Sequence, residues 1–161
     1  MALKRARELK PLSSEHHQAL LLAFQLKKAI AGHAETAGAP KDMGGLLALA
    51  RRYEDSVLRN HTAAEEDLLG RFLAVEDMQR LKGEHAQMRQ FLEQARSAPE
   101  GRQRGALLSF ADLLERHVRW EERELFPRCE ERISAEALAS LGRELEVRLV
   151  RAGRVATNHR A

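Results

Sequence analysis

Residues 107–125 read LLSFADLLERHVRWEEREL, and one face of this stretch decides the fold. Its inward positions recur in steps of three and four, which is the spacing of a single face on an α-helix. His117 and Glu121 occupy two positions where core side chains belong. The helix is predicted over about residues 102–131, and Pro127 is expected to kink or fray its last turns. The positions on this face are Leu107, Phe110, Leu114, His117, Glu121 and Leu125.

Three segments before this stretch carry the same helical period. They are predicted as helices over about residues 13–35, 45–73 and 76–97. Ser13 or Ser14 is expected to cap the first helix after Pro11. A loop rich in Gly and Pro separates the first two helices over residues 36–45. The apolar face of the second helix begins at Leu47, and Glu54 interrupts it.

The chain of 161 residues is therefore predicted to be an all-α protein. Four helices joined by short loops pack as an up-down-up-down four-helix bundle. A fifth, C-terminal helix over about 134–150, capped by Ser134, is expected to lie against the bundle or against a partner. We expect a single domain over 1–161, with the bundle at about 12–132 and a basic tail at 151–161. The apolar side of the fifth helix would allow a homodimer; it consists of Leu138, Leu141 and Leu145.

Composition argues against several classes of protein. The formal net charge of +3 is mild, and interleaved acids and bases indicate solvated helix faces rather than a nucleic-acid surface. No apolar run is long enough to cross a membrane, and the N-terminus lacks the pattern of a signal peptide. A single cysteine, Cys129, excludes an intrachain disulfide and indicates a cytoplasmic protein. The arginines near the C-terminus are expected to form a frayed, solubilising end; they are Arg148, Arg151, Arg154 and Arg160.

Each of the four bundle helices carries a histidine on its apolar face. On the first helix His16 is in phase with Leu12 and Ala19, while its neighbour His17 is in phase with Leu20 and stays an alternative. Two of the four histidines are followed by a glutamate four residues later, so each pair points the same way from its helix. The histidines are His16, His61, His85 and His117, and the paired glutamates are Glu65 and Glu121.

Burying four imidazoles and two carboxylates in a bundle core costs free energy unless something compensates them. A metal does so, and this donor set suits iron, manganese or zinc. Four nitrogens and two bridging carboxylates give roughly eight metal–ligand bonds, which favours two ions over one. An oxo or hydroxo bridge would supply part of the remaining coordination, leaving open positions for O₂, NO or peroxide.

The order His, His-x3-Glu, His, His-x3-Glu on four successive helices resembles the hemerythrin-like (HHE cation-binding) domains of bacteria. The stretches EHHQAL at 15–20 and HVRWEERELFP at 117–127 are also similar to that family. The resemblance covers about residues 12–132. It implies a four-helix bundle around two iron ions in an oxo- or hydroxo-bridged non-haem di-iron centre, with zinc or manganese as substitutes. It assigns ligand roles to His16, His61, Glu65, His85, His117 and Glu121, the two glutamates bridging.

Two positions depart from the oxygen-carrying members of that family. Those proteins place a second histidine one turn along the third helix, where this chain has Arg89. They also place an aspartate five residues after the last histidine, where this chain has Glu122. One histidine fewer favours redox chemistry, ligand sensing or iron handling over reversible O₂ carriage.

The leading hypothesis is a non-haem di-iron protein that binds or senses O₂, NO or reactive oxygen species, or handles iron. One alternative is a di-iron oxidoreductase that reduces peroxide or NO or oxidises ferrous iron, although no acid or base distinct from the ligands is evident. Another is a metal-free helical interaction module. Glu66 and Glu122 are interpreted as partners of ligands, and Tyr53, Trp120 and Cys129 as packing residues.

Overall fold

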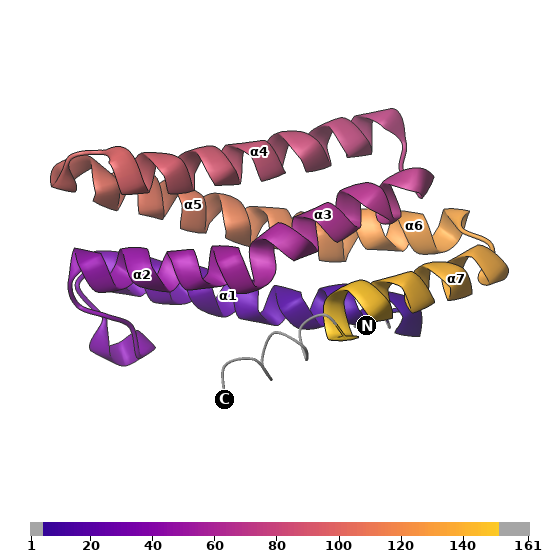
Figure 1. Ribbon diagram of the computed structural model, residues 1–161, viewed down its shortest axis with the longest axis horizontal. Coiled ribbons are helices and arrows are strands. Elements are labelled where there is room, and N and C mark those ends of the chain that lie inside the picture. Colours follow the sequence, from indigo (N-terminus) through magenta and orange to yellow (C-terminus); the bar gives the residue numbers. More distant parts are fainter. Residues whose placement is uncertain (1–4, 152–161) are drawn as a thin grey trace.

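The computed structural model describes residues 5–151, and every regular element in this range is helical. The chain forms four long helical segments and a fifth C-terminal segment (Figure 1). Two of the four are built from two α-helices joined by a π-helical turn. The α-helices are α1 (Lys10–Ile30), α2 (Met43–Tyr53), α3 (Arg59–Asp67), α4 (Val75–Ser97), α5 (Glu100–Trp120), α6 (Phe126–Arg132) and α7 (Ala135–Leu145).

The four long segments run up and down alongside one another, and α7 lies beside one end of the bundle (Figure 1). The predicted fold, a four-helix bundle with an additional C-terminal helix, is therefore confirmed. Short irregular or 3₁₀ segments connect the helices, including Glu35–Ala37 and Leu69–Phe72. Among residues 5–151, no helix combines the length and apolar character needed to cross a bilayer.

The first helix begins earlier than predicted. It starts at Lys10 with Pro11 in its first turn, where the missing proline N–H costs no helical hydrogen bond. The predicted cap at Ser13 or Ser14 is therefore wrong, and the Ser13 hydroxyl instead donates to the Glu122 carboxylate at 2.6 Å. The helix ends at Ile30 rather than near residue 35.

Gly32 explains this early end. Its positive φ of 88° lets the backbone turn back, so that the N–H groups of Gly32 and His33 donate to the carbonyls of Ala29 and Lys28. The loop prediction for residues 36–45 is partly wrong, because a 3₁₀ turn occupies 35–37 and α2 already begins at Met43. The Asp42 side chain caps α2 by accepting a hydrogen bond from the backbone N–H of Gly45.

The second long segment also ends sooner than predicted. Its α-helical part stops at Asp67, and the chain continues as the 3₁₀ turn Leu69–Phe72. Leu46 rather than Leu47 is the buried residue at the start of its inner face. Glu54, which interrupts the apolar stripe, is buried and forms an ion pair with Arg96 at 2.5 Å.

Two π-helical turns, Glu54–Leu58 and Glu121–Leu125, keep the inner faces aligned. From His117 the inward positions advance by three steps of four to Cys129. In a regular α-helix this spacing would carry the side chain roughly 120° around the axis. The extra residue of a π turn takes back about 100° of that rotation. The turn also precedes Pro127, so the helix continues to Arg132 instead of fraying.

The apolar core consists of two clusters, one towards each end of the bundle. Along each of the four long segments the two clusters meet around a histidine. His16 stands between Leu12 of one cluster and Ala19 of the other, and His85 stands between Leu81 and Met88. The polar residues of the inner faces therefore form a layer between two dry regions.

The C-terminal segment packs within the chain. Leu141 and Leu145 are buried in the apolar cluster that also contains Leu12 and Leu81. Most of the apolar side proposed for a homodimer is therefore already covered. Arg148 pairs with Asp67 of α3, which corrects its assignment to a frayed end. Arg151 is exposed at the end of the last helical turn, and residues 152–161 of the predicted basic tail, including Arg154 and Arg160, lie outside the described residues.

Gly142 lets α7 approach the N-terminal segment closely. A Cβ at this position would lie 2.9 Å from the Cβ of Glu8 and 3.2 Å from its Cα. We expect Gly142→Ala to lower the free energy of unfolding by about 1–3 kcal/mol, because the crowded atoms belong to or adjoin the backbone. Urea denaturation measures this change. Gly83→Ala, at a helical position with open space, is the control and should stabilise by up to about 1 kcal/mol; equal effects would contradict the packing argument.

Candidate metal centre

The structure brings the six predicted ligand residues together in the polar layer between the two apolar clusters. His16 comes from α1, His61 and Glu65 from α3, His85 from α4, His117 from α5, and Glu121 from the π turn that follows α5. All six side chains are buried, and the two carboxylates are completely inaccessible to solvent. His17, the alternative on the first helix, is exposed.

The six residues form two groups that share both carboxylates. One group contains His16 and His61, the other His85 and His117, and Glu65 and Glu121 belong to each. Within each group the possible ligand atoms all lie within 4.8 Å of one another.

Each carboxylate directs one oxygen to each group. Glu65 Oε1 lies 3.0 Å from His61 Nε2, while its Oε2 lies 3.2 Å from His85 Nε2. Glu121 Oε2 lies 3.0 Å from His16 Nε2, while its Oε1 lies 3.0 Å from His117 Nε2. Neighbouring ligands of an ion with bonds of about 2.1 Å in octahedral geometry are roughly 3.0 Å apart. With this spacing, each group could hold one cation, and Glu65 and Glu121 would offer one oxygen to each.

The outer nitrogen of every inner histidine is hydrogen-bonded to a glutamate. The distances from Nδ1 to the carboxylate oxygen are 2.7 Å for His16, 2.7 Å for His61, 2.8 Å for His85 and 2.6 Å for His117. A carboxylate only accepts hydrogen bonds, so each Nδ1 carries the proton. In a neutral ring Nε2 is then a bare acceptor. The glutamates are Glu122, Glu15, Glu66 and Glu84, in the order of the histidines above.

These acceptors converge on one another. The Nε2 atoms of His16 and His61 are 3.1 Å apart, as are those of His85 and His117. All four oxygens of Glu65 and Glu121 are buried, and none has a hydrogen-bond partner within residues 5–151. Acceptors this close to each other in a buried layer are costly unless protons or cations lie between them. The residues present therefore fit a pair of metal ions.

In the absence of a cation, the glutamates favour protonated histidines. Burial opposes the charge on His61, but Glu65 and Glu15 outweigh it and raise the pKa of His61 to about 9. Burial likewise opposes the charge on His117, while Glu121 and Glu84 raise its pKa to about 10. The histidines in turn hold the pKa of Glu65 below its ordinary value despite burial. A metal must therefore displace protons from this site.

The metal-free protein should consequently lose stability on going from pH 6 to pH 9. The raised pKa values of His61 and His117 contribute stability that is complete below the ordinary value of 6.5 and disappears as the pH rises through about 9–10. We expect the free energy of unfolding to fall by several kcal/mol over this range, about 3 kcal/mol for each of the two histidines. Urea denaturation of chelator-treated protein at several pH values tests it. A flat or rising profile would contradict the arrangement of charges described here.

Two of the four outer glutamates were missed by the reasoning from sequence. Glu66 and Glu122 contact inner histidines as predicted, but Glu15 and Glu84 do so as well. Each of the missed residues immediately precedes an inner histidine in the sequence. A neighbouring residue lies about 100° further around the helix, which directs it to the adjacent helix instead of the centre. The dipeptide Glu-His occurs on both the first and the third helix, at Glu15-His16 and Glu84-His85, and this repetition could have pointed to the two missed glutamates.

Two of these glutamates are themselves anchored. Arg5 donates to Glu122 at 2.8 Å, and together with His16 and Ser13 it overcomes burial and lowers the pKa of Glu122 to about 2. Arg80 donates to Glu84 at 2.9 Å and stacks over the Trp120 ring. The N-terminal segment is thus connected to His16 through Arg5 and Glu122.

Other residues weighed from the sequence have clear positions. Trp120 is buried in the apolar cluster that also contains Leu12 and Leu125, as a packing residue would be. Burial raises the pKa of Cys129 to about 12, so its thiol is protonated and unreactive at neutral pH. Burial and the charges of Glu15, Glu65 and Glu121 raise the pKa of Tyr53, which keeps its phenol neutral. Arg89, one turn after His85, is exposed and plays no part in the cluster.

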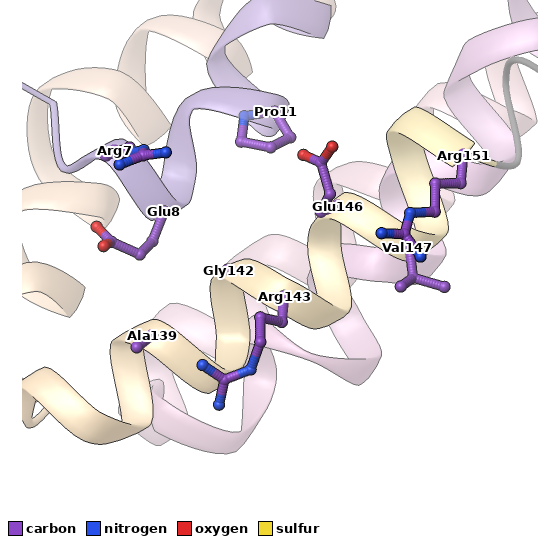
Figure 2. Close-up of a pocket in the computed structure, with 9 residues that line it drawn as sticks. All are labelled: Arg7, Glu8, Pro11, Ala139, Gly142, Arg143, Glu146, Val147 and Arg151. Carbon is purple, nitrogen blue, oxygen red and sulfur yellow. The ribbon is translucent and has the colours of Figure 1, made fainter.

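The centre is separate from the surface cavities. A cavity of about 560 Å³ lies between the N-terminal segment and α7, where Arg7, Glu8, Gly142 and Arg143 line it (Figure 2). None of the six inner residues lines this cavity. The six inner residues are instead enclosed within the bundle.

The comparisons with known proteins agree with this geometry. The family model described as Hemerythrin HHE cation binding domain matches residues 8–129, and a second match covers residues 76–148. No curated protein and no solved structure matches the chain. The first match spans all six inner residues and all four outer glutamates.

Proposed function

Because this chain belongs to the hemerythrin HHE cation-binding domain family, we propose that its six inner residues hold two iron ions that bind a small oxidising or radical ligand, namely O₂, NO or peroxide. One observation carries this proposal. Each of the two groups has two histidine nitrogens that converge with one oxygen from each shared carboxylate, and all four oxygens lack hydrogen-bond partners within residues 5–151.

The donor set favours iron with open coordination positions. Each group offers four residues as ligands, whereas iron with mixed imidazole and carboxylate ligands takes up to about six donors. A pair of iron ions would supply reversible one- or two-electron chemistry at these positions. The chain's own contribution is to orient the histidines through their outer hydrogen bonds and to keep water out of the layer.

Burial limits the size of the ligand. His61 is the most exposed of the six inner side chains, and only 5% of its surface is accessible. Apolar side chains close the layer above and below. This enclosure favours diatomic molecules or peroxide over a larger organic substrate.

Anaerobic loading with Fe²⁺ followed by ligand addition tests the proposal. We expect uptake of about two ions per chain and a new near-ultraviolet or visible absorption when O₂, NO or peroxide is added. The absorption should weaken or shift in His85→Ala, which removes a ligand from one group only. Failure to take up iron, or an iron-loaded spectrum that none of these ligands changes, would contradict the proposal.

The same experiment separates a binding protein from an enzyme. Binding or sensing predicts that one equivalent of ligand changes the spectrum without further consumption. Sustained consumption of peroxide or NO by the wild-type protein, abolished in His61→Ala, would replace the binding function by that of an oxidoreductase.

A further inference from the structure

The four outer glutamates form a closed ring around the bundle. Each one accepts a hydrogen bond from a histidine on the next long helical segment, so the contacts run from the first segment to the second, third and fourth and back to the first. Glu15 of α1 holds His61, Glu66 of α3 holds His85, Glu84 of α4 holds His117, and Glu122 after α5 holds His16. We call these four residues the outer glutamate ring.

The outer glutamate ring contributes two residues to each of the two groups. Glu122 and Glu15 orient the histidines of the first group, and Glu66 and Glu84 orient those of the second. In each group one glutamate is anchored by an arginine, Arg5 for Glu122 and Arg80 for Glu84. The other glutamate of each pair has only its histidine as a hydrogen-bond partner within residues 5–151. Each group therefore has one histidine whose glutamate is anchored by an arginine, and one histidine whose glutamate has no other hydrogen-bond partner among the described residues.

We propose that the outer glutamate ring positions all four histidines so that each presents Nε2 inward before a cation arrives, and that each glutamate acts on the ion of its own group. The inference rests on the proposed metal function. A carboxylate that accepts the Nδ1 proton fixes which nitrogen is free and strengthens it as a ligand. Loss of such a partner typically weakens metal binding by 10- to 100-fold.

Glu66 gives the cleanest test because its one hydrogen bond, among the described residues, is to His85. Glu66→Leu removes the acceptor, while Glu66→Gln retains an amide oxygen that can accept the Nδ1 proton. Glu131→Gln is the matched control, since Glu131 is exposed and changes the net charge equally. Titration with Co²⁺ measures the affinity of each ion without requiring any catalytic activity.

The proposal predicts that Glu66→Leu weakens one of the two Co²⁺ ions at least tenfold and leaves the other within about threefold of wild type. Glu66→Gln should recover most of this loss, and Glu131→Gln should match wild type. In the proton NMR spectrum of the Co²⁺-loaded protein, Glu66→Leu should remove or broaden one of four shifted, exchangeable Nδ1–H signals.

Equal Co²⁺ affinities in Glu66→Leu and wild type would overturn the proposal while leaving the metal centre intact. Equal weakening of both ions in Glu66→Leu, without recovery in Glu66→Gln, would overturn it too, because that result indicates a general structural role. Failure of the wild-type protein to bind two Co²⁺ ions would instead count against the proposed function itself.

Discussion

Replacing Glu65 with alanine is expected to abolish the binding of both metal ions, whereas replacing His61 with alanine should impair only one. The two oxygens of Glu65 face different groups, one towards His61 and the other towards His85. His61 Nε2 belongs to the first group alone. Metal analysis after loading and desalting should therefore give about two ions per chain for wild type, one for His61→Ala and none for Glu65→Ala.

Glu54→Gln is the matched control for this series. Glu54 is a second buried glutamate of the same long segment, but it pairs with Arg96 outside the cluster. Its replacement should reduce stability and leave the metal content at two ions per chain. If Glu65→Ala kept two ions, or if Glu54→Gln lost them while remaining helical by circular dichroism, the assignment of the shared ligands would be wrong.

Removing the metal is expected to lower the free energy of unfolding by about 5 kcal/mol. Each ion contributes about 2.7 kcal/mol when its free concentration is 100 times its Kd, provided that the unfolded chain does not bind it. The dependence on pH should change as well. Protons compete with the metal for His61 and His117, so the loaded protein should gain stability between pH 6 and pH 9, where the metal-free protein loses it.

The His117→Leu variant distinguishes this account from a metal-free interaction module. Without metal, the replacement removes the buried partner of Glu121 and Glu84, so the variant should be about 3–5 kcal/mol less stable than wild type at neutral pH. With metal, the variant should lack the stabilisation from the ion that His117 binds. Urea denaturation of both proteins, with and without chelator, gives the four values needed. A variant that responds to metal as wild type does would show that His117 is no ligand.

The helical fold and the convergence of the inner residues could be predicted from the sequence because both depend on one helical period. Steps of three and four place His117 and Glu121 on the face that carries Leu114, and the same rule applies to the other helices. Burial then requires that these faces meet. The same helical period places His16 rather than His17 on the inner face of the first helix, and His16 is indeed buried while His17 is exposed.

The remaining features depend on contacts between segments that one helical period does not describe. The π turn at Glu121–Leu125 contains no residue that signals it, yet it keeps Leu125 and Cys129 inward. Glu15 and Glu84 lie off the apolar faces, so their role appears only when the adjacent helix is in place. The start of α1 before Ser13 likewise reflects the tolerance of a first helical turn for proline.

The most direct test is to count the iron ions and measure their magnetic coupling in one loaded sample. If two iron ions occupy the two groups, the shared carboxylates of Glu65 and Glu121 would provide a path for exchange coupling. Mössbauer and electron paramagnetic resonance spectra should then show two iron ions per chain that behave as one coupled unit. A single iron ion per chain, or two ions with independent magnetic signals, would contradict a centre in which Glu65 and Glu121 bridge both metals.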